Sequence, residues 1–274
     1  MKHHRLIGLI AVLAALALTP ATASAWAPAD SATIHPGVMT FTDGAQCTSN
    51  FVLTQGSDVY IGQAAHCAGT GAATDTNGCD AGSLPLGTPV EVDGASRPGT
   101  LVYSSWLAMQ NAGEQDGETC DFNDFALVKL DPADVPNVNP SIPSWGGPNG
   151  IGTSAVGQTV YTYGNSSLRG GVTTLSPKQG KTIGVSPGGW SYDVYTATPG
   201  IPGDSGSAFL NSTGKALGVL VTVQIAPVAG SNGVSDFGKL LAYARGHGFP
   251  NLTLVLGTEP FSAGAVGSAL GGML

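Results

Sequence analysis

A serine set among glycines, Ser205 in segment 198–207, is the first candidate for chemistry. Glycine permits unusual backbone angles and a close approach of the chain, so the amides of Gly203 and Ser205 could point at one spot and bind a developing oxyanion. A serine oxygen is a weak nucleophile until a base removes its proton, and that base needs a third group to fix its tautomer. Nucleophilic chemistry at Ser205 therefore requires a histidine and a carboxylate.

His66 is the histidine whose setting favours this role. It follows a run of apolar and small residues and is followed at once by a cysteine, which would hold its backbone in place. His35 and His247 lie in turn settings and are predicted to be surface residues. Asp124 opens the apolar run 125–130, where a carboxylate is costly unless it is hydrogen-bonded. Asp121 is its nearby competitor, and we expect Asp124 to be the third group.

The N-terminal segment predicts export. It has a basic opening with Lys2 and Arg5, an apolar run over 6–18 and a small-x-small pattern at 23–25. This is the layout of a secretory signal peptide over residues 1–25, and the apolar run is shorter than the about 20 residues that a bilayer span needs. We therefore expect a secreted, extracellular protein.

The cysteines agree with an oxidising compartment. They are even in number and form no CxxC pair, which favours two disulfides over a metal site. Spacing alone leaves all three connectivities open. The four cysteines are Cys47, Cys67, Cys79 and Cys120.

Composition excludes several partners. The net charge is −8, charged residues make up only 10%, and no Lys/Arg cluster is present. Phosphate contacts and anionic membranes both require basic side chains, so neither nucleic acid nor a membrane surface is an expected partner. The acidic residues are too scattered for a calcium loop, and the sequence suggests no metal and no cofactor.

Short β-prone runs bounded by Gly, Asn, Asp and Pro dominate the chain and predict an all-β fold of antiparallel sheets. They include 51–54, 90–92, 100–103, 125–128, 159–163 and 192–195. One segment, about 236–246, has helical spacing, with Ser235 as its candidate N-cap. The turn spacing favours an antiparallel sandwich or barrel. The predicted organisation is a β-unit over 26–135, a Pro-rich linker over 136–150, a second β-unit of similar size with the helix over 151–261, and a tail of small residues, compatible with disorder, over 262–274.

Three blocks in a fixed order resemble the signatures of the chymotrypsin-like (trypsin-fold) serine proteases, in particular their short secreted bacterial members. They are 64–67 (Ala-Ala-His-Cys), 123–127 (Asn-Asp-Phe-Ala-Leu) and 203–207 (Gly-Asp-Ser-Gly-Ser). Each block alone is a weak signal, but their order in an exported all-β chain is specific. The closing helix also fits the family.

The resemblance implies two packed antiparallel six-stranded β-barrels with the site in the cleft between them. It implies a serine endopeptidase that acts, as a monomer, on protein or peptide substrates. His66 would be the general base and then acid, Asp124 would orient it, and Ser205 would be acylated, with the Gly203 and Ser205 amides as the oxyanion hole. The family's bridge beside the histidine would be Cys47–Cys67, which leaves Cys79–Cys120 by subtraction.

The sequence departs from the family pattern at several positions. It lacks the basic residue and Ile-Val-Gly-Gly-type start whose freed amine pairs with the acid before the nucleophile. Asp204 therefore needs another partner, for which Arg169 is our hypothesis. Val221 replaces the serine that usually supports the triad carboxylate. Pro199, not an aspartate, stands at the base of the specificity pocket, which favours uncharged side chains before the scissile bond. The resemblance implies as substrate-binding residues Pro199, Gly200, Val221, Thr222 and Val223.

Other classes of protein stay open at this point. Ser205, Asp236 and His247 run in the α/β-hydrolase order, but no βαβ alternation surrounds them and the second glycine of G-x-S-x-G is missing. The Gly-Asp-Ser triplet also occurs in esterases, usually near the mature N-terminus. The other alternative is a catalytically weak or inactive protease-fold binding protein.

Overall fold

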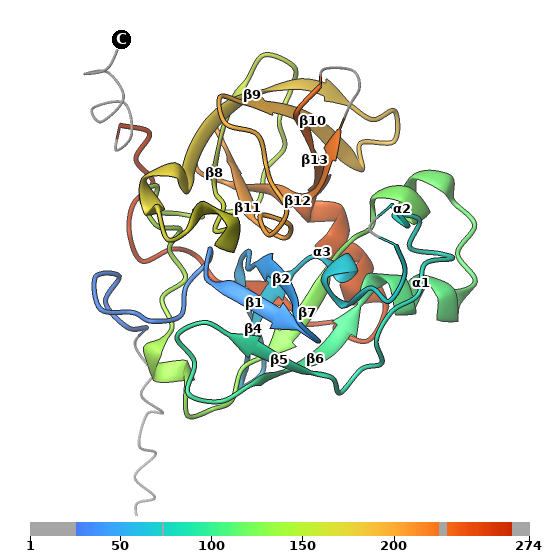
Figure 1. The fold of residues 1–274 in the computed structure, drawn as a ribbon, viewed down its shortest axis with the longest axis horizontal. Coiled ribbons are helices and arrows are strands. Elements are labelled where there is room, and N and C mark those ends of the chain that lie inside the picture. The colour runs from blue at the N-terminus through green and yellow to red at the C-terminus, as the bar shows by residue number, and fades with distance from the viewer. Residues whose placement is uncertain (1–25, 73, 225–228, 265–274) are drawn as a thin grey trace, which may run out of the picture.

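The computed structural model describes residues 26–72, 74–224 and 229–264. The predicted signal peptide over 1–25 and most of the predicted tail, residues 265–274, lie outside the described residues. Figure 1 shows two β units stacked on each other, with three α-helices at and beside their junction. The predicted all-β class is confirmed.

The first unit is an antiparallel sheet of eight strands in the order β14-β3-β4-β7-β6-β5-β1-β2. Its strands carry alternating or continuous apolar residues: one face of the sheet buries the core of the first unit, and the other face joins the core shared with the second unit. They are β1 (Met39–Thr42), β2 (Ala45–Thr48), β3 (Val52–Gln55), β4 (Asp58–Gln63), β5 (Pro89–Val92), β6 (Gly99–Ser104), β7 (Ala126–Lys129) and β14 (Thr253–Leu254).

The second unit is a closed six-stranded barrel in the order β10-β13-β12-β11-β8-β9. Its strands are β8 (Thr159–Tyr163), β9 (Pro177–Val185), β10 (Ser191–Thr196), β11 (Ala208–Asn211), β12 (Ala216–Gln224) and β13 (Ser231–Asp236). The barrel shape expected for this half is therefore observed. The first half departs from the expected six-stranded barrel, because it is an eight-stranded sheet in which β14 returns from the C-terminal end and pairs Leu254 with Leu53 at the edge.

One hydrophobic core joins the two units. The Phe237 ring packs on Phe51 at 4.5 Å and on Phe125 at 6.1 Å between ring centroids, and all three side chains are fully buried. The predicted linker contributes to the same core, since Trp145 is buried against Tyr161 of β8 at 4.8 Å between ring centroids. Shared apolar burial of this kind holds the two units in one fixed relation.

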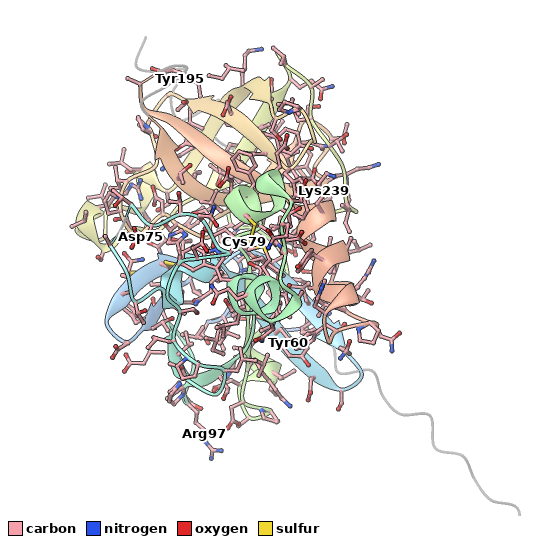
Figure 2. All side chains as sticks on the ribbon, turned by 90° about the vertical axis from the view of Figure 1, so that its right-hand side faces the viewer. Tyr60, Asp75, Cys79, Arg97, Tyr195 and Lys239 are labelled. Carbon is pink, nitrogen blue, oxygen red and sulfur yellow. A yellow bond between two sulfur atoms is a disulfide. The ribbon has the colours of Figure 1, made fainter. Side chains whose placement is uncertain are left out.

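Helix α3 (Phe237–Gly246) matches the predicted helix closely, but its N-cap is Asp236, whose carboxylate accepts from the Lys239 amide at 2.9 Å. The predicted cap, Ser235, lies in β13 and donates its hydroxyl to the Phe122 carbonyl at 2.5 Å. Two helices were not predicted, α1 (Ser105–Ala112) and α2 (Gly117–Phe122). Figure 2 shows these short helices beside Cys79 and Lys239 on one side of the molecule.

Short 3-10 helices complete the description. They are η1 (Ala65–Ala68), η2 (Val135–Asn137), η3 (Ser167–Arg169) and η4 (Thr173–Leu175). Two of them, η1 and η3, carry residues of the candidate site. Within the described ranges, no helix is long and apolar enough to cross a bilayer.

Candidate active site

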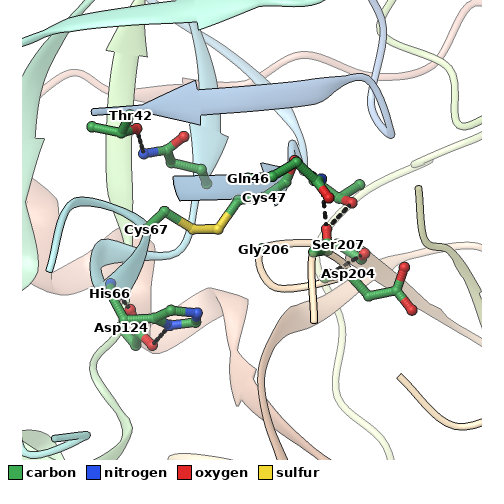
Figure 3. Close-up of a disulfide and its surroundings, with 12 residues drawn as sticks. Thr42, Gln46, Cys47, His66, Cys67, Asp124, Asp204, Gly206 and Ser207 are labelled. Atoms are coloured by element: carbon green, nitrogen blue, oxygen red, sulfur yellow. Dashed lines mark hydrogen bonds and ion pairs between the residues drawn. A yellow bond between two sulfur atoms is a disulfide. The ribbon is translucent and has the colours of Figure 1, made fainter. Parts of the chain in front are cut away.

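His66 and Asp124 lie together at one end of the adjacent central strands β4 and β7 of the first sheet. His66 is carried by η1, directly after β4, and Asp124 stands between α2 and β7. The His66 Nδ1 atom lies 2.6 Å from Asp124 Oδ2, and the His66 amide donates to Asp124 Oδ1 at 2.9 Å. Both carboxylate oxygens are thus used to hold one residue, as Figure 3 shows. The side chains are 26% and 9% exposed, so the pair is reachable from solvent only through the imidazole.

The Asp124 carboxylate fixes the tautomer of His66. An ionised carboxylate only accepts, so Nδ1 must carry the proton and Nε2 keeps its lone pair. Burial disfavours the imidazolium, but the charge of Asp124 and its hydrogen bond outweigh burial and raise the pKa of His66 above its ordinary value. A histidine in this state can accept a proton at Nε2 and hold it.

The competing residues are placed elsewhere. Asp121 is exposed and accepts from Asn77 at 3.4 Å. His247 Nδ1 bonds the Tyr243 carbonyl at 2.8 Å, while Asp236 caps α3 and accepts from the Tyr192 hydroxyl. The α/β-hydrolase alternative therefore has no acid–histidine pair, and the paired strands of both sheets are antiparallel.

Ser205 lies in a tight turn of the second unit that is bound to the first unit. The Thr48 amide donates to the Ser205 carbonyl at 2.8 Å, and Asn50 Nδ2 donates to the Gly206 carbonyl at 3.1 Å. Gly206 has φ +89°, and a Cβ there would come 2.3 Å from the Thr48 carbonyl oxygen, so only glycine fits. The Ser205 hydroxyl is partly exposed and, among the described residues, forms no hydrogen bond.

Two disulfides bind the elements around this site. Cys47–Cys67 joins the end of β2 to η1, beside both His66 and the Thr48 contact, and Cys79–Cys120 ties α2 to the loop between η1 and β5. Both predicted pairings are confirmed. The sulfurs of Cys47 and Cys67 lie near the His66 ring, but a disulfide offers no thiolate, so this cluster is not a metal site.

Asp204, the residue before Ser205, is fully buried and lies between two cations. Arg169 contacts both carboxylate oxygens at 2.5 Å, which confirms the predicted pair. Lys178, not predicted, lies 2.6 Å from Asp204 Oδ2. Burial disfavours the carboxylate, but the two cations outweigh it and lower the pKa of Asp204, while burial lowers the pKa of Lys178 against the opposing effect of Asp204.

Lys178 could have been suspected from its strand. It alternates with exposed Gln179 along β9, which puts it on the same inward face as buried Thr182. An inward lysine needs a buried acid, and the sequence pattern gives no sign of which acid that is.

The expected substrate-binding residues lie beside this cluster. The Pro199 carbonyl accepts from Lys178 Nζ at 3.2 Å, and the Gly200 amide donates to the buried Asn232 side chain at 2.8 Å. Val221 is buried in the shared core at a shift in the register between β12 and β13, followed by half-buried Thr222 and by Val223 in the same strand.

Comparison with known proteins agrees with this geometry. The family described as "Trypsin-like peptidase domain" matches residues 51–219, which include His66, Asp124 and Ser205. Protease A of Thermobifida fusca has 20% identity and a TM-score of 0.51 and aligns over 82% of this chain and 99% of its own. The chymotrypsin of Cellulomonas bogoriensis has 18% identity and a TM-score of 0.47 over 81% and 98% of the two chains.

A search of the curated proteins found no match. At 20% identity, the likeness to the Thermobifida protease shows a shared fold. The family match covers well over half of the chain. The chain therefore belongs to the trypsin-like peptidase family of serine proteases.

Proposed function

We propose that this protein is a secreted serine endopeptidase that hydrolyses peptide bonds through an acyl-enzyme on Ser205. The observation that carries the proposal is the His66–Asp124 pair at 2.6 Å, held next to a nucleophile turn whose Ser205 carbonyl is bound by Thr48. Secretion is supported by the signal-like segment 1–25 and by two disulfides.

The proposed reaction has two halves. Ser205 Oγ forms a bond to the scissile carbonyl carbon while its proton passes to His66 Nε2, and the oxyanion is bound by the Gly203 and Ser205 amides. The carbon–nitrogen bond then breaks as His66 returns the proton to the leaving amine. Water, deprotonated by His66, hydrolyses the acyl-enzyme and restores the Ser205 hydroxyl. Asp124 stabilises the imidazolium in both halves.

The proposed substrate is an extended peptide beside β12. On the β11 side, the backbone pairing of β12 ends at Leu220, which bonds Gly206 and Ser207. Among the described strands none pairs with Val221–Val223 on that side, which leaves this edge for a substrate strand. Pro199, at the predicted base of the specificity pocket, has no carboxylate that could bind a basic side chain. Its carbonyl already accepts a hydrogen bond from Lys178. We propose uncharged side chains before the scissile bond.

The test is labelling of the secreted protein with a peptidyl phosphonate. We expect one adduct, on Ser205, that is lost in Ser205→Ala and His66→Ala. His247→Ala is the matched control, because that histidine bonds the backbone of α3 and should label like the wild type. Peptide amide hydrolysis by the wild type separates a peptidase from an esterase. No labelling of the folded wild type would favour the inactive binding protein.

A further inference from the structure

All four carbonyls of the turn 202–205 are engaged by hydrogen-bond donors. Gly203 O accepts from Thr48 Oγ1 at 2.7 Å and Gln46 Nε2 at 3.0 Å, and Asp204 O accepts from the Ser207 amide and hydroxyl. Ser205 O accepts from the Thr48 amide, as described above. Pro202 O accepts from the Ser166 hydroxyl at 2.5 Å. The orientation of each peptide plane in the turn is therefore fixed by a named contact.

These contacts leave two amides free. The Pro202–Gly203 peptide is trans, so its N–H points opposite to its carbonyl, away from Ser166. The Asp204 carbonyl is directed at Ser207, which turns the Ser205 N–H to the opposite side. Among the described residues, neither Gly203 N nor Ser205 N has an acceptor. Two free amides beside a candidate nucleophile, one of them its own, can bind an oxyanion.

The Pro202–Gly203 plane depends on a single side chain. Gly203 has φ +96° and no Cβ, so its backbone can adopt other angles at little cost. If this peptide rotated by half a turn, the Pro202 carbonyl oxygen would replace the Gly203 N–H and would repel an oxyanion. Within the part of the chain that the structure describes, the Pro202 carbonyl accepts a hydrogen bond from Ser166 alone.

Ser166 is itself held in place. Its side chain is buried, 2% exposed, and its Oγ accepts from the Leu168 amide at 3.2 Å as the N-cap of η3. The same short turn ends in Arg169, which pairs with Asp204. One element of the second unit therefore contacts the nucleophile turn on two sides, at Pro202 and at Asp204.

We propose that Ser166 is a positioning residue that holds the Pro202–Gly203 peptide with the Gly203 N–H directed at the oxyanion. This inference rests on the proposed function. Ser166 touches no reacting atom and acts through Gly203. Its effect should therefore appear in binding of the transition state and not in binding of the ground-state substrate.

The experiment compares Ser166→Ala with Ser167→Ala, an exposed neighbour whose hydroxyl forms no hydrogen bond among the described residues. The readouts are kcat and KM on a peptide amide and the affinity of a peptide boronic acid, whose tetrahedral adduct places an oxygen in the oxyanion site. Removing one oxyanion donor costs about 10²–10³ in kcat. We expect Ser166→Ala to lose roughly 10- to 100-fold in kcat and in boronate affinity, with KM within about two-fold. This loss is smaller than that for removing a donor, because the Gly203 amide itself remains.

A second pair removes the question of folding. Ser166→Thr keeps the hydroxyl, and Ser166→Val has the shape of the threonine variant without the hydroxyl. The threonine variant should therefore have a higher kcat and a higher boronate affinity than the valine variant. Equal values for Thr and Val, values for Ser166→Ala equal to those for Ser167→Ala, or a loss confined to KM would each overturn the proposal. A folded wild type with no hydrolysis and no boronate adduct would instead overturn the proposed function and this inference with it.

Discussion

Removing both cations that contact Asp204, with Arg169→Met and Lys178→Met, should destabilise the protein more than the two single changes together. Asp204 is fully buried, and its oxygens are contacted by Arg169 at 2.5 Å and by Lys178 at 2.6 Å. After either single change one cation still neutralises the carboxylate. After both, the Ile201 amide, at 3.1 Å, is the one donor to it that remains among the residues the structure describes.

The expected magnitude follows from these contacts. Each single variant loses hydrogen bonds to a charged group but keeps the other cation, so its cost should lie at the lower end of the range for such bonds, about 1.5 kcal/mol in the free energy of unfolding. The double variant keeps an uncompensated buried charge, which costs about 3–5 kcal/mol. The interaction term between the two sites should then be about 1 kcal/mol, because they share one partner.

The pH dependence is the sharper prediction. In the wild type the folded pKa of Asp204 is lowered, so the stability it contributes is present above the unfolded pKa of about 3.9 and is lost as pH falls through the folded value. In the double variant burial acts without a cation and raises the folded pKa. Its stability then falls as pH rises above about 3.9. The difference between the two proteins should grow from pH 3 to pH 7.

The assay is urea unfolding at both pH values, with Lys181→Met as the matched control. Lys181 lies on the same strand, β9, but is exposed and donates to the Gly157 carbonyl. We expect that control to stay within about 0.5 kcal/mol of the wild type. A loss in the double variant that is equal at pH 3 and pH 7 would refute the reasoning, because a buried unpaired carboxylate must titrate.

Two further predictions concern the first unit. Asp124→Asn should lower kcat by about 10⁴ without unfolding the protein. It should also move the midpoint of the rising limb of kcat/KM against pH downward, since Asp124 raises the pKa of His66; an unchanged midpoint would contradict that cause. Replacing Cys79 and Cys120 together by serine opens a bridge between residues 41 apart and should cost about 4 kcal/mol in urea unfolding. A loss below about 1 kcal/mol would mean that packing of α2, not the bridge, orders this region.

The sequence predicts those parts of the site that depend on short segments of neighbouring residues. His66, Asp124 and Ser205 each stand in a local setting of small, apolar or glycine residues that constrains the backbone. The structure brings His66 and Asp124 into contact, and the role of Ser205 stays a proposal. Arg169 could be predicted because Asp204 needs a cation as its partner, and that requirement follows from charge alone.

The parts that were missed are decided by contacts distant in sequence. Ser235 and Asp236 are both good N-cap residues, and the choice falls to Asp236 because Ser235 is paired in β13 and donates to Phe122, 113 residues away. Helix α1 has little amphipathic pattern and is fixed by burial of Trp106 and Met109 under the first sheet. Neither outcome can be obtained from periodicity.

The two cations on Asp204 also bear on activation. In trypsin-like zymogens, a freed N-terminal amine supplies the positive charge at this carboxylate. Here Oδ1 is taken by Arg169, and Oδ2 by Arg169, Lys178 and the Ile201 amide. A further ammonium group would have to displace one of these donors and would add a third positive charge to a buried site, at a desolvation cost of several kcal/mol. The positive charge beside the turn 202–205 is therefore supplied from within the second unit, by Arg169 and Lys178.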